Sequence, residues 1–271
     1  MLTRREQLAK RLKRVRLCLG GAARHAATPV FVFGAQRSGT NMLARLLERH
    51  PRVECLHEYD DEAFRDYVLK DDAHIERLIG RSRASSIVFK CISDSQRARA
   101  ILNRFPTARS IWIHRSCDDV VNSSLENFRE HCEYLRLVLE EPGRAGWRRE
   151  NLSDQDLASI SRHHGRGIDD ASARALIWFL RNSLLFRQDL LRDGRTLVLR
   201  YEDLVRSPRR ECELITRFLG LAVSGRMAAG VHPRSIGKKA VRDIDPEIRA
   251  LCDELADRLH AAGRDGRRLA A

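Results

Sequence analysis

Residues 29–43 read PVFVFGAQRSGTNML, and this segment constrains the fold more than any other part of the chain. Residues 30–33 are apolar and rich in β-branched and aromatic side chains, which predicts a buried parallel strand. After the glycines, Ala44, Leu46 and Leu47 have the spacing of an amphipathic helix. A strand, a glycine loop and a helix N-terminus can place several backbone N–H groups around one anion. The segment therefore predicts an α/β fold with a phosphate-binding turn.

The residues inside this turn distinguish two reaction classes. Gly34 and Gly39 have the spacing of a nucleotide triphosphatase P-loop, in which Lys and a magnesium-binding hydroxyl follow the second glycine. Here Thr40 occupies the Lys position and Asn41 the hydroxyl position, while the basic residue, Arg37, lies within the loop. The pattern argues against ATP hydrolysis and favours an anionic donor that is handled without metal. A P-loop-like small-molecule kinase, dependent on magnesium, is the alternative enzyme.

A second segment, RSIWIHRSCDDVVNSSL at residues 109–125, predicts another strand followed by a helix. Residues 111–113 are apolar, and Val120 and Val121 give the following helix an apolar face. Arg115 then lies at the carboxyl end of a strand, the edge at which open α/β sheets bind ligands. Arg115 and Ser123, eight residues apart, can converge on one phosphate, the guanidinium from one side and the hydroxyl from the other.

These segments, followed by LRYEDLV and RECELITRFLGL, resemble in order the sulfotransferases that use 3′-phosphoadenosine 5′-phosphosulfate (PAPS), over residues 30–222. The resemblance implies a three-layer, P-loop NTPase-like fold with a central, mostly parallel sheet between helices. It implies metal-independent transfer of a sulfuryl group from PAPS to an acceptor hydroxyl. It assigns the 5′-phosphosulfate to the first loop and the 3′-phosphate to Arg115 and Ser123. The first-loop residues are Gly34, Arg37, Ser38, Gly39, Thr40 and Asn41.

The stretch HPRVECLHEYDD, residues 50–61, resembles the part of carbohydrate-type members that carries a catalytic glutamate. Glu58 is accordingly the first candidate for the general base, because an acceptor hydroxyl must lose its proton as it attacks sulfur. His57 is the rival, since imidazole titrates near neutrality without special tuning. Glu54 and the acidic residues 60–62 are weaker candidates, and the acidic residues fit a solvated loop better.

Two lysines are further candidates from the resemblance. Lys90 ends the apolar strand SSIVFK and is a candidate contact to the sulfuryl group or the acceptor, although a solvated strand end explains it equally well. HPRSIGKKAV, residues 232–241, weakly resembles the late basic loop over the 3′-phosphate, which makes Lys238, with Gly237 and Ser235, a candidate donor contact.

The YEDL element carries two acids, Glu202 and Asp203, after a predicted strand at residues 196–200. We interpret them as structural, with Arg200 as a partner for one of them.

Composition agrees with one enzyme domain. The chain has 271 residues, 43% of them hydrophobic, which is sufficient for one large core over residues 29–265. Its seven cysteines are scattered without a CxxC pair, which is typical of reduced thiols and predicts a cytoplasmic protein without a zinc site. The net charge of +13 is consistent with a cleft for a polyanionic donor.

The N-terminal arm, residues 1–28, contains eight Lys or Arg and one acidic residue. Its leucines recur at near-helical spacing, so a basic amphipathic helix that contacts an anionic membrane through residues 1–27 is one interpretation, and a solvated or packed arm is the other. A non-catalytic basic membrane-binding or nucleic-acid-binding protein is the non-enzyme alternative. With 6% aromatic residues and no RNP-like or zinc-finger pattern, the sequence does not favour nucleic-acid binding.

Residues 129–170 are the least regular part of the chain, and we interpret them as an insertion on the acceptor side. Trp147 among Arg144, Arg148 and Arg149 suits stacking on a sugar or an anionic acceptor. The adjacent His163 and His164 are expected on the surface. We expect a small-molecule acceptor, a carbohydrate or a glycolipid, and the sequence does not indicate an oligomeric state.

Overall fold

The computed structural model describes residues 12–15, 17, 26–128, 131–232 and 236–269, the last four as backbone only. Five parallel strands form its central sheet in the order β2-β5-β1-β6-β7. Their bounds are β1 Thr28–Gly34, β2 Val53–His57, β5 Ser86–Lys90, β6 Arg109–His114 and β7 Thr196–Arg200. The strands predicted at residues 30–33 and 196–200, at SSIVFK and around residues 111–113 are all confirmed.

The sheet is buried on both faces because its side chains alternate between two apolar cores. Along β1, Phe31 and Phe33 belong to one core, and Val30 and Val32 belong to the other. Since every strand of the sheet runs in the same direction, the loops that follow the strands meet at one edge. The three-layer α/β architecture predicted from the sequence is therefore confirmed.

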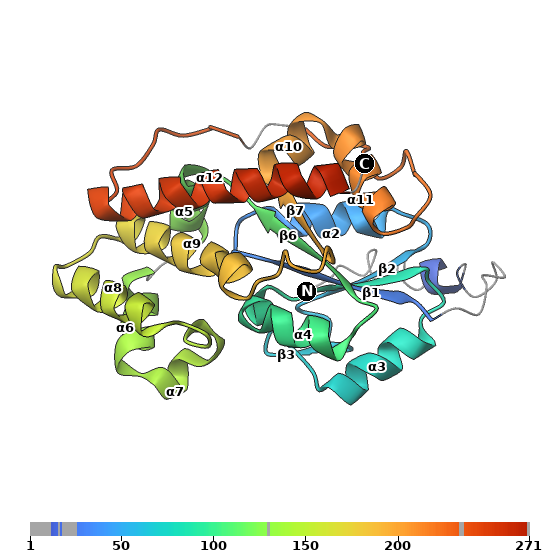
Figure 1. Ribbon diagram of the computed structural model, residues 1–271, viewed down its shortest axis with the longest axis horizontal. Coiled ribbons are helices and arrows are strands. Elements are labelled where there is room, and N and C mark those ends of the chain that lie inside the picture. Colours follow the sequence, from blue (N-terminus) through green and yellow to red (C-terminus); the bar gives the residue numbers. More distant parts are fainter. Residues whose placement is uncertain (1–11, 16, 18–25, 129–130, 233–235, 270–271) are drawn as a thin grey trace.

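Helices cover both faces of the sheet (Figure 1). On the face of Val30 lie α2 Thr40–Glu48, α10 Tyr201–Arg206 and α11 Pro208–Phe218. On the face of Phe31 lie α3 Asp72–Arg81, α4 Ala98–Arg104, α5 Cys117–Asn127, α9 Asp170–Arg187 and α12 Pro246–Leu269. The remaining elements are β3 Phe64–Arg65 paired with β4 Val68–Leu69, the 3-10 helix η1 Ile92–Arg97, α6 His131–Glu140, α7 Pro142–Ala145, η2 Gly146–Arg148 and α8 Asp154–Gly165.

The region predicted to be an insertion forms a separate lobe beside α9. Helices α6, α7 and α8 gather at one end of the molecule, away from the sheet (Figure 1). Ser153 caps α8 by accepting a hydrogen bond from the backbone N–H of Asp156, and Asp156 pairs with Arg187 of α9. His163 is buried, and not on the surface as expected, because it faces Asp245 and Glu247 at the start of α12.

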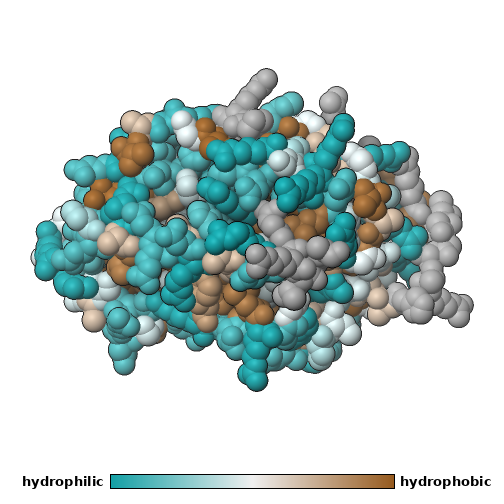
Figure 2. Space-filling model, turned by 45° about the horizontal axis from the view of Figure 1, so that its top comes forward, coloured by the Kyte–Doolittle hydropathy of each residue, from teal (hydrophilic) through white to brown (hydrophobic). Residues whose placement is uncertain are grey.

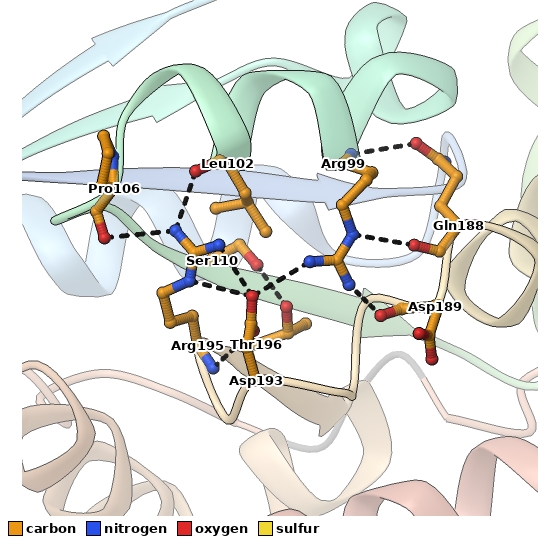
Figure 3. A network of polar contacts seen from close by, with 9 residues as sticks. All are labelled: Arg99, Leu102, Pro106, Ser110, Gln188, Asp189, Asp193, Arg195 and Thr196. Carbon is orange, nitrogen blue, oxygen red and sulfur yellow. Dashed lines mark hydrogen bonds and ion pairs between the residues drawn. The ribbon is translucent and has the colours of Figure 1, made fainter.

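A network of polar contacts at the amino edge of the sheet fixes the end of α9 at Arg187 (Figure 3). Arg99 donates to the carbonyl oxygens of Gln188 (3.0 Å) and Asp189, and these bonds replace the helical ones. Arg195 holds the same turn to the end of α4, by donating to the carbonyl oxygen of Leu102 at 2.8 Å and to Asp193. The turn before β7 is therefore fixed to α4.

The described part of the N-terminal arm packs against the domain. Leu17 is buried, and Arg14 forms ion pairs of 2.6 Å with both Glu54 and Glu62. The rest of residues 1–27, to which a membrane contact was assigned, lies largely outside the described residues. In the described part of the chain, no helix combines the length and apolarity of a membrane span. The face seen in Figure 2 is largely hydrophilic, with small separate apolar patches.

Candidate active site

The first glycine loop joins the carboxyl end of β1 to the N-terminus of α2. Its backbone is left-handed at Arg37 (φ 68°) and at Gly39 (φ 94°). A Cβ atom on Gly34 would lie 2.4 Å from the carbonyl oxygen of Ile113, and one on Gly39 would lie 2.1 Å from Cδ2 of Tyr201. Both positions therefore require glycine. The first turn of α2 carries no acidic residue, so its N–H groups are not opposed by a local negative charge.

Two polar groups of this loop have capacity for a ligand. The Ser38 hydroxyl is fully buried and has no hydrogen-bond partner among the described residues. Arg37 is partly buried and has no carboxylate partner there; its Nε donates to Ser123 Oγ at 3.0 Å, and its guanidinium carbon lies 5.7 Å from the Phe128 ring centroid. Burial and the charge of Arg115 lower the pKa of Arg37. A phosphate or sulfate group would satisfy both Ser38 and Arg37.

Arg115 lies beside the same loop, at the carboxyl end of β6. It is 8% exposed, its Nη2 lies 3.2 Å from Asp119 Oδ2, and its guanidinium carbon lies 4.7 Å from the centroid of the Tyr201 ring. Because Tyr201 also contacts Gly39, this ring lies between the first loop and Arg115. The structure thus brings the two predicted donor contacts together, with Ser123 bound to Arg37.

The described end of the late basic loop, residues 236–241, lies along α5. The Gly237 N–H donates to Asp119 Oδ1 at 3.1 Å, Asn122 donates to the carbonyl oxygen of Ala240 at 3.2 Å, and Lys239 forms an ion pair with Glu126. Lys238, the lysine singled out from the sequence, is exposed and has no hydrogen bond or ion pair with a described residue. Ser235 lies outside the described residues.

The two candidate bases have different surroundings. Glu58 Oε1 accepts a hydrogen bond of 2.7 Å from Lys90 Nζ, and Lys90 is 1% exposed, so it is not the solvated strand end that was the alternative. His57 is buried, stacks on Tyr59 with ring centroids 5.2 Å apart, and has its Nε2 3.9 Å from Glu48 Oε2 of α2. The described contacts thus connect Glu58 to Lys90 and connect His57 to α2.

Helix α9 holds three loops of this edge through their backbone carbonyl groups. Arg174 Nη2 donates to Gln36 O (2.9 Å) after β1, and Trp178 Nε1 donates to Arg115 O (3.0 Å) after β6. Arg181 Nη2 donates to Ile92 O (2.8 Å) after β5. The three donors, at spacings of four and three residues, occupy one face of the helix. Their spacing in the sequence shows that they share a helix face, but not which carbonyl groups they reach.

The YEDL element is structural, as interpreted from the sequence. Glu202 is buried, and its Oε1 accepts a hydrogen bond of 2.9 Å from the backbone N–H of Ser116. Its Oε2 accepts one of 3.2 Å from Arg200. Glu202 thereby fixes the turn that begins α5, next to Arg115. The element itself is helical, because α10 starts at Tyr201 directly after β7.

A comparison with protein-family models identifies the family of this chain. The chain matches the model described as the sulfotransferase family over residues 29–84 and 65–225. The chain belongs to the sulfotransferase family. This confirms the family resemblance noted in the sequence and the assignment of the chain as a sulfotransferase. A search of curated proteins gave no match. Within the described residues, no group of three His, Cys, Asp or Glu side chains is arranged to hold a metal ion.

Solved sulfotransferases have the same fold. A sulfotransferase from Alicyclobacillus acidocaldarius is 19% identical, with a TM-score of 0.52 over 89% of this chain and 97% of that one. The sulfotransferase domain of the Synechococcus PCC 7002 olefin synthase is 18% identical, with a TM-score of 0.52 over 86% and 96%. The sulfotransferase domain from the curacin biosynthetic pathway is 14% identical, with a TM-score of 0.53 over 86% and 98%. The predicted sulfotransferase fold is therefore confirmed.

Proposed function

We propose that this sulfotransferase transfers the sulfuryl group of PAPS to an acceptor hydroxyl, on a carbohydrate or a glycolipid, by in-line displacement. The observation that carries the proposal is the proximity of Arg37 and Arg115, with the Tyr201 ring between the first glycine loop and Arg115. Two neighbouring guanidinium groups beside a helix N-terminus suit a donor with phosphates at both ends of one nucleoside. The buried, unsatisfied Ser38 hydroxyl fits the same ligand.

The residues then have distinct roles. PAPS supplies an activated sulfuryl group, whose bond to the 5′-phosphate breaks as the acceptor oxygen bonds to sulfur. The first loop, with Arg37, Ser38 and the N–H groups of Gly39, Thr40 and Asn41, holds the 5′-phosphosulfate and stabilises charge that develops on the departing phosphate. Arg115 and Ser123 hold the 3′-phosphate. Gly237 binds Asp119, the partner of Arg115, so the next residue, Lys238, can approach the same phosphate.

Glu58 is the proposed base. The acceptor proton moves to its carboxylate, and Lys90, which donates to Glu58 Oε1 at 2.7 Å, orients that carboxylate. Lys90 itself is buried at the carboxyl end of β5, where it can also approach the transferred group. His57, which the described contacts connect to α2, is the alternative base.

Calorimetry with adenosine 3′,5′-bisphosphate tests the donor assignment. We expect the wild type to bind it and Arg115→Ala to bind at least about tenfold more weakly, because a charge-assisted contact is lost. Near-wild-type affinity in that variant would contradict the 3′-phosphate assignment. Arg37→Ala should abolish turnover, and Glu58→Gln should give a folded, donor-binding, inactive protein.

The competing explanations have separate outcomes. Wild-type activity in Glu58→Gln, with activity lost in His57→Gln, would move the base role to His57. Turnover that requires ATP and disappears when magnesium is chelated would replace sulfuryl transfer with the kinase alternative. Donor binding without turnover across a broad acceptor panel would favour the non-catalytic alternative. Radiosulfate labelling of a lysate from cells that lack the protein is the direct route to the acceptor.

A further inference from the structure

Four arginines extend from the first glycine loop into the lobe of α6 and η2. We define the arginine strip as Arg37 of the loop, Arg174 and Arg181 of α9, and Arg148 of η2. None of the four has an ion pair with a carboxylate among the described residues. Arg187 and Arg136 differ in this respect, since Arg187 pairs with Asp156 and Arg136 pairs with Glu133.

The members of the strip are neighbours. Arg174 binds the carbonyl oxygen of Gln36, which precedes Arg37, and Arg181 and Arg148 lie 5.0 Å and 4.8 Å from the Trp147 ring centroid. Burial, and then the charges of Arg181 and Arg37, lower the pKa of Arg174 to about 10, although Tyr134 acts in the opposite direction. Burial and the charge of Arg148 also lower the pKa of Arg181, against Tyr134, Asp94 and Glu150. Of those two carboxylates, Asp94 pairs with Arg97, and Glu150 accepts a hydrogen bond of 2.9 Å from the neutral amide of Gln96. Arg37 and Arg174, at the other end of the strip, form no ion pair with a described carboxylate, so positive charge remains along the strip.

One member of the strip has an unused donor. Arg174 is 3% exposed, its Nη2 donates to the carbonyl oxygen of Gln36, and its Nε has no hydrogen-bond partner among the described residues. A buried guanidinium N–H that remains unbonded is costly, and an anion is the ligand that satisfies it best. Because Gln36 directly precedes Arg37, the unbonded Arg174 Nε lies near the first glycine loop, to which the 5′-phosphosulfate of PAPS is assigned.

The far end of the strip adds an aromatic surface. The rings of Tyr134 and Trp147, both partly exposed, meet edge to face with centroids 6.4 Å apart. The guanidinium of Arg148 lies 4.8 Å from the Trp147 ring centroid and 5.6 Å from that of Tyr134, and Arg181 lies 5.0 Å from that of Trp147. Partly exposed aromatic rings beside cations are suited to a sugar ring that carries a negative charge.

We propose that the arginine strip binds an anionic group on the acceptor, so that the substrate is a hydroxyl compound that also carries a carboxylate, sulfate or phosphate, such as an acidic saccharide. The inference rests on the proposed function, because Arg37 is its link to the donor site. It narrows the acceptor class, since a neutral saccharide would leave the charges of Arg174 and Arg148 without a counter-ion.

Two matched probes test the strip by binding alone. p-Nitrophenyl β-D-glucuronide and p-nitrophenyl β-D-glucoside differ only at C6, which is a carboxylate in the first and a hydroxymethyl group in the second. Their affinities are measured by calorimetry in saturating adenosine 3′,5′-bisphosphate. We expect the wild type to bind the glucuronide about tenfold more tightly, as one charge-assisted contact would give. Arg148→Gln should remove most of this preference, and Arg148→Lys should restore part of it. Arg144→Gln is the control, because Arg144 is exposed and pairs with Glu141.

The outcomes separate this inference from the proposed function. Equal affinities in the wild type, or no binding of either probe while adenosine 3′,5′-bisphosphate still binds, would overturn the strip and leave the donor assignment standing. Equal losses for both probes in Arg148→Gln would assign Arg148 to packing of the lobe and would likewise overturn it. Failure of the wild type to bind adenosine 3′,5′-bisphosphate would overturn the proposed function itself.

Discussion

Gly39→Ala should damage both stability and donor binding, through the ring of Tyr201. The backbone at Gly39 is left-handed, which costs an L-residue about 1–2 kcal/mol. The new Cβ would also lie 2.1 Å from Cδ2 and 2.7 Å from Cε2 of Tyr201, so the ring must move, at about 1–3 kcal/mol for an overpacked core. We therefore expect the free energy of unfolding to fall by about 2–5 kcal/mol. Because Arg115 lies 4.7 Å from the same ring, affinity for adenosine 3′,5′-bisphosphate should fall as well.

A double-mutant cycle in urea unfolding separates the two costs. In a Tyr201→Ala background the ring is absent, so Gly39→Ala should cost only the backbone component, about 1–2 kcal/mol. The difference between the two backgrounds measures the steric component. If Gly39→Ala costs the same in both backgrounds, the ring contact is not the cause. If it costs nothing in either, the reasoning about this loop is wrong.

Two further predictions concern residues around the site. Trp178→Phe removes the hydrogen bond to the carbonyl oxygen of Arg115 and should weaken binding of adenosine 3′,5′-bisphosphate. The control, Trp112→Phe, removes the hydrogen bond to Asn182 and should cost similar stability but leave that affinity unchanged. Equal affinities of the two variants in calorimetry would refute a positioning role for α9. Burial, with the charges of His260 and Arg200, lowers the pKa of His114 to about 3. As the pH drops below about 6.5, the unfolded chain therefore takes up a proton that the folded chain does not, and the free energy of unfolding decreases. His114 alone should remove about 2 kcal/mol between pH 7 and pH 5, and a His114→Gln protein with an unchanged pH dependence in urea unfolding would contradict this.

The first glycine loop and the turn after β6 could be predicted well from the sequence, because their signals are local. A strand such as residues 30–33, followed by Gly34 and Gly39, specifies both its own conformation and the edge of the sheet at which it ends. Arg115 and Ser123 followed from the same argument, and the structure places them beside the first loop. The resemblance to a known family gave the order of these motifs, which the family model supports.

The features that the sequence did not reveal depend on tertiary contacts. The burial of His163 depends on Asp245 and Glu247, about eighty residues away, and Asp119 appears in the sequence as one more surface acid although it bonds both Arg115 and Gly237. The roles of Arg174 and Arg181 depend on the carbonyl groups that they reach, which no periodicity of α9 encodes. Lys90 was ambiguous for the same reason, because only the folded chain brings Glu58 to it.

The hydrogen bonds from α9 to three carbonyl groups have a mechanical consequence. A rotation or shift of this helix carries the peptides at Gln36, Arg115 and Ile92 with it, so the turns after β1, β6 and β5 move as one rigid body. Since α6 of the outer lobe packs on the same helix, a displacement of α6 by a bound molecule would be transmitted to these three turns. Occupancy on one side would then change the affinity on the other, and by thermodynamic linkage the effect would be reciprocal.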